Sequence, residues 1–188
     1  MLAPASATRA VQIALLSWGA IELALRLRAG PGRHRFDWSL LVLVASMAAA
    51  FTIGFRVSEA RSTLIGGGWA PVAVGLAVLC LGVGLRVWAI LTLGRFFRFV
   101  VVIQEGHRVV RTGPYRRLRH PAYTGTLIAF AGAGIGLANW LSVLVLTVLP
   151  LAGLLVRIRA EEAALTAALG DEYREYAAHT RRLIPGVW

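Results

Sequence analysis

The stretch GPYRRLRHPAY, residues 113–123, holds the side chains of this chain that are best suited to chemistry. Its two tyrosines and its histidine can donate hydrogen bonds or exchange protons, and its three arginines can bind carboxylates or phosphates. One glycine and two prolines fix the backbone around these polar groups. A second polar segment, RIRAEEAAL, begins at Arg157 and places Glu161 and Glu162 after an apolar run. Together the two segments predict a site for a charged ligand at the edge of an apolar region.

Other chemistries fit these residues less well. His107 and His120 are thirteen residues apart and have no Cys or His partner at the spacing of a metal site, so we expect no metal. No Ser or Cys lies in a nucleophile elbow near them, and Thr112 and Thr124 have no evident partner base. A glycine-rich strand-to-helix turn for a nucleotide is absent from the sequence. A polybasic segment that only binds lipid headgroups remains an alternative.

The composition indicates an integral membrane protein. Of the 188 residues, 57% are hydrophobic and only 15% are charged, which is too apolar for an ordinary soluble domain. The net charge of +11 comes from arginines that lie between apolar blocks. A nucleic-acid-binding protein would carry such charge on one soluble face, so we expect no nucleic-acid partner.

Membrane-length apolar runs predict an all-α fold with five transmembrane helices. A helix needs roughly 20 apolar residues to cross the hydrocarbon core. Three runs of this kind cover about residues 10–27, 38–55 and 69–93. The last apolar block, 123–156, is too long for one span, and GIGLANW at 134–140 supplies turn and interface residues. We therefore predict a tight hairpin of spans four and five.

The placement of arginines predicts the orientation. With five spans, the loops after spans one and three and the C-terminal tail share one side and carry sixteen of the twenty arginines. Cytoplasmic loops carry such an excess, so we expect the N-terminus outside and the C-terminus in the cytoplasm, in the inner or plasma membrane of the cell. The first span is expected to be retained rather than cleaved as a signal peptide. The third loop and the tail then face each other at the cytoplasmic surface.

The remaining charged residues give three further expectations. After Arg157 the tail should form two short surface helices, with Gly170 ending the first and Asp171 capping the second. Within the spans, Glu22 and Arg86 should form a mutual pair, or Arg86 should extend to the interface. The three arginines of the first motif, Arg116, Arg117 and Arg119, should mainly bind headgroups and set topology.

Three segments of the second half together resemble a known family. HRVVRTGPYRRLRHPAYTG, then RIRAEEAAL, then GDEYREYAAHTRRLIPGVW closely resemble the C-terminal catalytic region of the isoprenylcysteine carboxyl methyltransferase family. The resemblance covers about residues 95–188, and residues 1–94 match only in being membrane spans. It therefore implies a three-span N-terminal membrane region, 1–94, and a cofactor-binding catalytic region, 95–188. Related phospholipid N-methyltransferases share much of the motif, so the methyl acceptor stays open.

The resemblance also implies a cofactor, S-adenosyl-L-methionine, and a lipophilic substrate that enters from the bilayer, with membrane lipids as surroundings. Arg157 would bind the substrate, and Arg157 and Glu161 would be catalytic. By position in the motifs, the residues around the cofactor would be Gln104, His107, Arg108, Val109, Val110, Tyr115, His120, Pro121, Ala122, Tyr123 and Glu161.

The chemistry of these residue types fits this implied reaction. S-Adenosylmethionine carries a carboxylate, an ammonium and a sulfonium, so its site needs donors such as His120 and Tyr115 and an acid such as Glu161. A carboxylate acceptor is already a nucleophile at neutral pH and needs orientation, which Arg157 could supply. This favours O-methylation of a lipid-linked carboxylate over N-methylation of an ethanolamine headgroup. The alternatives are a phospholipid N-methyltransferase and a non-enzymatic, polybasic lipid-binding membrane protein.

Overall fold

The described residues of the chain fold into helices and contain no strand, which confirms the all-α prediction. The computed structural model describes residues 5–29, 37–59, 64–65, 68–97 and 109–184. Two short 3-10 helices, η2 (Gly94–Phe96) and η3 (Gly113–Arg116), follow the third long helix. The α-helices are α1 (Ala5–Ala29), α2 (Trp38–Val57), α3 (Ala70–Leu93), α4 (Pro121–Gly136), α5 (Trp140–Leu169) and α6 (Asp171–His179).

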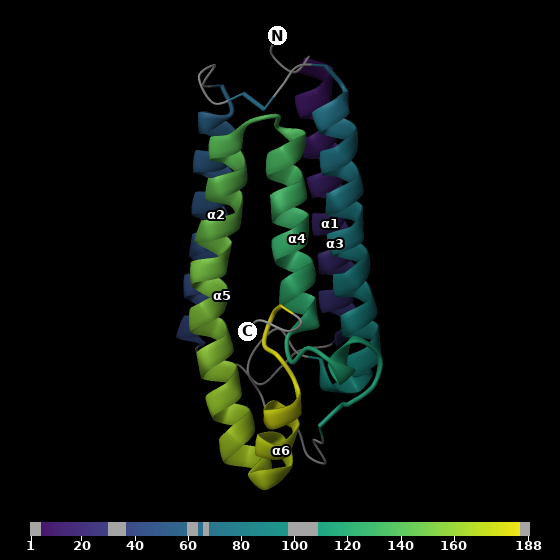
Figure 1. Ribbon diagram of the computed structural model, residues 1–188, viewed down its shortest axis with the longest axis vertical. Coiled ribbons are helices and arrows are strands. Elements are labelled where there is room, and N and C mark those ends of the chain that lie inside the picture. Colours follow the sequence, from purple (N-terminus) through teal and green to yellow (C-terminus); the bar gives the residue numbers. More distant parts are fainter. Residues whose placement is uncertain (1–4, 30–36, 60–63, 66–67, 98–108, 185–188) are drawn as a thin grey trace.

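The five long helices form an elongated bundle in which successive helices run in opposite directions (Figure 1). α2 packs along α5, α3 packs along α4, and α4 packs against α5. α1 lies against α3 and α4. The short helix α6 and the loop that contains η3 lie together at one end of the bundle, whereas the α4–α5 connection lies at the other end (Figure 1).

An apolar core joins all five long helices. Trp18 of α1 packs edge-on against Phe130 of α4, with ring centroids 5.5 Å apart. Phe130 and Leu146 of α5 are both almost fully buried in the same cluster. Leu79 of α3 and Ala50 of α2 complete it. The bundle is therefore held together across its middle, and the polar site lies at one end.

Glycines let α3 and α4 approach closely. A Cβ atom built on Gly82 would lie 2.3 Å from the backbone nitrogen of Ala129, and one on Gly75 would lie 2.2 Å from that of Gly136. Such approaches are typical of membrane helices, where small residues at an interface allow close backbone packing. This contact fixes α4 against α3. The polar stretch 113–123 leads into the start of α4, so its end is fixed as well.

Three of the described helices are long and apolar enough to cross a membrane: α2, α3 and α5. α4 has 16 residues, so its length of about 24 Å falls short of the roughly 30 Å hydrocarbon core. α1 has 25 residues, but its sequence includes Arg9, Glu22, Arg26 and Arg28. Length and composition thus support a membrane-spanning bundle, with three helices meeting both criteria.

The last apolar block forms two helices joined by a tight turn, as predicted. α4 begins at Pro121, where the missing N–H of a proline costs little, and ends at Gly136. Only residues 137–139 connect it to α5. The side chain of Asn139 accepts a hydrogen bond from Ser142 N (3.1 Å), which caps α5, and donates to the carbonyl of Val57 (3.2 Å). The connection is therefore tied to the end of α2.

The tail differs from the expected pair of surface helices. α5 continues without a break to Leu169, because the residues after Arg157 are mostly good helix formers and none is Gly or Pro. Gly170, at φ 55°, ends α5 as predicted, and α6 follows at once. The predicted cap was wrong: Gly170 occupies the cap position, and Asp171 lies in the first turn with its carboxylate 2.6 Å from Arg174.

The predicted pair of Glu22 and Arg86 is confirmed. The Arg86 guanidinium binds the Glu22 carboxylate, with Nη2 and Oε2 2.8 Å apart. Trp18 Nε1 also donates to Glu22 (3.0 Å), and Arg86 Nη1 donates to Thr126 Oγ1 (3.0 Å) and to the carbonyl of Ala122 (3.4 Å). This ion pair links α1, α3 and the first turns of α4, so it supports the position of the motif at the start of α4.

Candidate functional site

The loop before α4 is folded against the end of α3. Tyr115 N donates to the carbonyl of Thr112 (3.1 Å) and closes the turn of η3. Gly113 has φ 55°, and a Cβ atom there would lie 3.1 Å from Thr92 Oγ1 on α3. The positive φ favours glycine here, and the absence of a side chain leaves room for Thr92. This turn directs the following residues toward α4.

The C-terminal segment, residues 180–184, runs beside this loop. Leu118 and Arg181 form a parallel bridge between the two segments. Backbone pairing of this kind fixes the main chain on both sides of His120. The backbone bonds are Arg119 N to Arg181 O (2.7 Å), His120 N to Arg182 O (3.1 Å) and Arg181 N to Arg117 O (3.0 Å). The Thr124 side chain adds a bond from Oγ1 to Leu183 O (2.8 Å).

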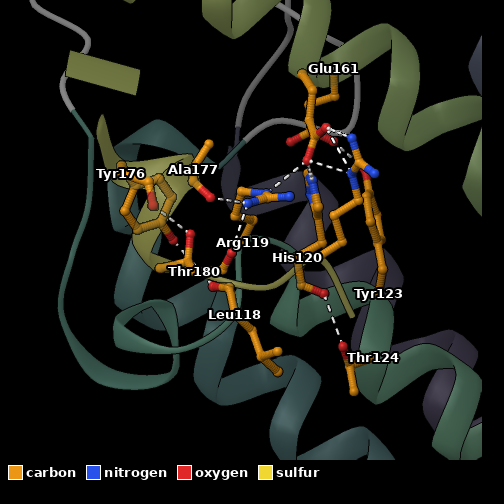
Figure 2. A network of polar contacts seen from close by, with 11 residues as sticks. Leu118, Arg119, His120, Tyr123, Thr124, Glu161, Tyr176, Ala177 and Thr180 are labelled. Carbon is orange, nitrogen blue, oxygen red and sulfur yellow. Dashed lines mark hydrogen bonds and ion pairs between the residues drawn. The ribbon is translucent and has the colours of Figure 1, made fainter. Parts of the chain in front are cut away.

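Glu162 gathers three basic side chains near the end of α5. Its carboxylate lies 2.9 Å from Arg119 Nε, 3.2 Å from His120 Nε2 and 2.9 Å from Arg182 Nη2. The three basic residues come from the loop and from the C-terminal segment, so one carboxylate ties both to α5. Figure 2 shows Arg119 and His120 turned toward this end of α5.

Arg119 does not act as the outward-facing headgroup ligand that the sequence suggested. Its side chain is only 11% exposed and also donates to the carbonyls of Ala177 and Thr180. Arg116 and Arg117, by contrast, are exposed. The motif RRLR therefore divides into two outward arginines and one that binds within the fold.

Glu161 belongs to a second chain of contacts. The hydroxyl of Tyr123 donates to Glu161 Oε2 (2.7 Å) and accepts from Arg157 Nε (3.4 Å). Arg157 also forms an ion pair with Asp37 and donates to Ser39 Oγ (2.9 Å). The contacts therefore run from the start of α2 through α5 and α4 and back to α5. The members of this chain of contacts are Asp37, Ser39, Arg157, Tyr123 and Glu161.

The two groups of residues lie against each other. Glu161 and Glu162 are consecutive on α5, and the rings of His120 and Tyr123 stack with centroids 5.5 Å apart and planes 14° apart. His120 binds Glu162, and Tyr123 binds Glu161. The end of the bundle thus combines two carboxylates with several cations and a phenol in one place (Figure 2). Such a combination can bind a zwitterionic ligand and orient an anionic one.

Tyr115 lies next to this site in an apolar cluster. Tyr115 is 6% exposed and packs with Ala89 and Ile90 of α3 and with Ala122. Burial raises the pKa of Tyr115 above its usual range, so the phenol keeps its proton and remains a donor. The hydroxyl of Tyr176 on α6 donates to the carbonyl of Tyr115 (2.9 Å), which fixes the turn from the other side.

Tyr173 on α6 presents a buried hydroxyl for which no hydrogen-bond partner exists among the residues that the structure describes. Tyr173 is 5% exposed, and burial raises the pKa of its hydroxyl, so the hydroxyl is protonated. An unpaired buried hydroxyl costs roughly 1–3 kcal/mol, which makes it a candidate contact for a ligand. The described residues hold no group of three or more His, Cys, Asp or Glu side chains that could bind a metal ion.

The structure brings several of the predicted site residues together. His120, Tyr123, Glu161 and Arg157 contact one another directly or through one neighbour. The others divide into two groups. One group lies in the adjoining loop and at the start of α4: Val109, Val110, Tyr115, Pro121 and Ala122. The other group lies outside the described residues: Gln104, His107 and Arg108.

Sequence reasoning missed several residues of the site. Asp37 was not singled out, although an acidic residue directly before an apolar run is an N-cap signal and its loop was assigned to the same side as the tail. Glu162 was named beside Glu161 but received no role. Arg182 was counted only for topology. Tyr173 was recognisable only as part of the segment GDEYREY, because no local sequence pattern shows that its hydroxyl is buried.

The family model described as the isoprenylcysteine carboxyl methyltransferase (ICMT) family matches residues 73–167. This range is just over half of the chain. The chain belongs to this family. The matched range contains the described site residues from Val109 to Glu162, whereas Asp37 and Tyr173 lie outside it.

Relatives of this ICMT-family chain include plant proteins. A probable protein-S-isoprenylcysteine O-methyltransferase of Oryza sativa subsp. indica is 35% identical over 121 residues, which are 63% of this chain and 63% of the relative. Protein-S-isoprenylcysteine O-methyltransferase B of Arabidopsis thaliana is 36% identical over 121 residues, 63% of this chain and 61% of the relative. The chain therefore spans less than two thirds of the length of these relatives.

A solved structure has a similar fold. The eukaryotic intramembrane Ras methyltransferase ICMT superposes with a TM-score of 0.60 at 30% sequence identity, over 78% of this chain and 52% of that chain. Together with the three membrane-length helices, this likeness establishes an integral membrane protein with an ICMT-like fold.

Proposed function

We propose that this protein is an integral membrane methyltransferase that transfers a methyl group from S-adenosyl-L-methionine to the carboxylate of a lipophilic, isoprenylcysteine-like acceptor. The observation that carries the proposal is the contact chain Arg157–Tyr123–Glu161 at one end of the bundle. It sets a carboxylate-binding cation next to an acid that can receive a positively charged ligand. Family membership and the names of the relatives support the same reaction.

The residues at this end fit the cofactor by their chemistry. When bound, S-adenosylmethionine supplies a methyl group on a positively charged sulfur. Its amino-acid carboxylate would find donors in His120 and Tyr115, and its positive groups would find Glu161. The hydroxyl of Tyr173, buried and without a partner among the described residues, supplies a further donor or acceptor. On the motif alone we assign Gln104, His107 and Arg108 to the same site, with Val109, Val110, Tyr115, Pro121, Ala122 and Tyr123.

Arg157 is proposed to orient the acceptor. It is 2% exposed and lies on α5 where the apolar part of the helix ends, so it can meet a carboxylate whose lipid chain stays in the membrane. A carboxylate needs no general base, because it is already the nucleophile at neutral pH. Holding nucleophile, methyl carbon and sulfur in line can lower such a barrier by roughly 7–11 kcal/mol. Positioning is therefore the contribution that we assign to Arg157 and Tyr123.

We further propose that all five long helices cross the membrane, with the site on the cytoplasmic face of the inner or plasma membrane. α4 is short, but it packs against both α3 and α5, which are long enough to cross. Glu22 in α1 is paired with Arg86, which lowers the cost of burying its charge in lipid. The arginine-rich loops and the tail then lie on the cytoplasmic side, as the positive-inside rule requires. Residues 95–188 supply most of the proposed cofactor site.

Calorimetry on the detergent-solubilised protein tests the cofactor part of the proposal. With a metal chelator present throughout, wild-type protein should bind S-adenosylmethionine or its demethylated product. The variants His120→Ala, Tyr115→Phe and Glu161→Gln should each weaken binding by about tenfold, or ~1.4 kcal/mol. The control Arg116→Ala/Arg117→Ala changes two exposed arginines and should bind normally.

Two other outcomes would point to other functions. One such outcome is that the wild type binds no cofactor, while its binding to lipid weakens stepwise as Arg116 and Arg117 are replaced. A non-enzymatic lipid-binding protein would then be the better account. If the wild type instead bound the cofactor but methylated only an ethanolamine headgroup, it would be a phospholipid N-methyltransferase. Either result would overturn the proposed reaction.

A further inference from the structure

Asp37, at the start of α2, uses its two carboxylate oxygens for different purposes. Oδ1 accepts hydrogen bonds from Ser39 N (3.1 Å), Leu40 N (3.2 Å) and Ser39 Oγ (2.6 Å), which caps α2. Oδ2 forms the ion pair with Arg157 Nη1. One side chain thus fixes both the start of a helix and the guanidinium group of the proposed acceptor site.

Burial makes this ion pair important for Arg157. The Arg157 side chain is 3% exposed and that of Asp37 12% exposed, so the guanidinium is largely removed from water. A buried cation that loses its partner is strongly disfavoured. Ser39 Oγ donates to Asp37 and accepts from Arg157, so the hydroxyl bridges the two charged groups. The orientation of Arg157 therefore depends on α2 as well as on its own helix.

We propose that Asp37 is a positioning residue for the methyl acceptor: it holds the Arg157 guanidinium in place, so the start of α2 is part of the acceptor site. This inference rests on the proposed role of Arg157. It extends the site beyond the residues matched to the family, 73–167, into the N-terminal helices. α2 packs against α5, which supports the contact between Asp37 and Arg157.

The geometry favours positioning over inhibition. An inhibitory carboxylate would have to leave Arg157 when an acceptor arrives. Asp37 is held by the backbone of α2 through its other oxygen, so its departure would also remove the helix cap. The pair is therefore a preformed element of the site. It also offsets much of the charge of Arg157, so an acceptor carboxylate would be oriented by hydrogen bonds and a neutral ester product would leave easily.

The variant Asp37→Asn separates the two uses of the side chain. Asparagine is as good an N-cap as aspartate, so the cap of α2 should be preserved, whereas the charge that holds Arg157 is lost. Because the Arg157 guanidinium is buried, we expect the protein to lose stability but to remain folded, which unchanged cofactor binding would show. We expect the KM for a farnesyl-cysteine analogue to rise at least about tenfold, as for truncation of one partner of a buried charge pair. The affinity for S-adenosylmethionine should not change. Asp37→Glu should recover part of the loss, and the exposed control Asp171→Asn should behave like wild type.

Direct binding of the analogue, measured alongside methyl transfer, distinguishes failure of this inference from failure of the proposed function. Weaker analogue binding by Asp37→Asn, with unchanged cofactor binding, supports the inference even if the wild type transfers no methyl group. In that case only the proposed reaction would fail. Equal binding of the analogue by Asp37→Asn and wild type would overturn the inference. Tighter binding by Asp37→Asn would also overturn it, because Asp37 would then compete with the acceptor.

Discussion

The hydroxyl of Tyr123 lies 2.7 Å from Glu161 Oε2 and 3.4 Å from Arg157 Nε. Tyr123 lies in the first turn of α4, and the other two residues lie one helical turn apart on α5, so they share a face. One phenol therefore bridges the cation that we assign to the acceptor and the carboxylate that we assign to the methyl donor. The hairpin of α4 and α5 is closed at its open end by this contact.

Tyr123→Phe should reduce activity far more than stability. The ring would still stack on His120, but Arg157 and Glu161 would lose their bridge. We expect a loss of about 1 kcal/mol in the free energy of unfolding, the usual value for one hydrogen bond. Methyl transfer should fall by more than about tenfold, mainly in kcat, because positioning is lost. Thr52→Val, which removes an exposed hydroxyl on α2, is the matched control. Equal activity of Tyr123→Phe and the control would contradict the proposed role of the bridge.

Substitution of Glu162 should mainly reduce stability, whereas substitution of Glu161 should mainly reduce cofactor binding. Glu162→Gln removes the carboxylate shared by Arg119, His120 and Arg182, so it should destabilise the protein by about 2–3 kcal/mol. Glu161→Gln should have a smaller effect on stability but should weaken cofactor binding. Thermal unfolding in detergent and calorimetry measure the two effects. The opposite pattern, with Glu161→Gln as the less stable variant, would show that the two carboxylates have been assigned the wrong roles.

These neighbouring glutamates also show where sequence-based prediction stops. Successive residues on a helix point about 100° apart, so the sequence alone could not tell which glutamate faces the loop. That choice depends on the rotation of α5, which packing against α2 and α4 decides. Asp37 and Arg157 are 120 positions apart in sequence, and no local pattern reports their contact.

Local signals predicted other features well. Pro121 marked the start of α4, and GIGLANW marked the turn into α5, because both depend on the backbone preferences of nearby residues. The Glu22–Arg86 pair was predictable because two isolated charges in apolar spans have few other partners. The continuous helix from Arg157 to Leu169 was missed, since a change from apolar to charged residues was taken as a helix boundary although nothing in it breaks a helix.

Gly82→Ala tests the close contact of α3 and α4. The added Cβ atom would lie 2.3 Å from the backbone nitrogen of Ala129, so the helices would have to separate. We expect destabilisation by about 1–3 kcal/mol, as for other overpacked sites. Gly84→Ala on the same helix meets nothing within 4 Å and should be neutral or slightly stabilising. Thermal unfolding of both variants in one detergent gives the comparison, and equal stability would argue against the packing.

Tyr173→Phe should separate ligand binding from folding. The hydroxyl is buried without a partner among the described residues, so its removal should leave the free protein equally stable or slightly more stable. If the hydroxyl contacts the cofactor, affinity for S-adenosylmethionine should fall about tenfold, or ~1.4 kcal/mol. Calorimetry and thermal unfolding of the same sample decide this. A variant that binds the cofactor as well as wild type would exclude Tyr173 from the site.

The most direct test of the proposed function is the transfer of labelled methyl from S-adenosylmethionine by the purified protein in lipid nanodiscs. A farnesyl-cysteine analogue and phosphatidylethanolamine are offered as acceptors in parallel, and the labelled products are treated with mild base. We predict label on the farnesyl-cysteine analogue that base releases, as expected for a methyl ester, and loss of this label in Arg157→Ala. Base-stable label on phosphatidylethanolamine that Arg157→Ala leaves unchanged would contradict the account.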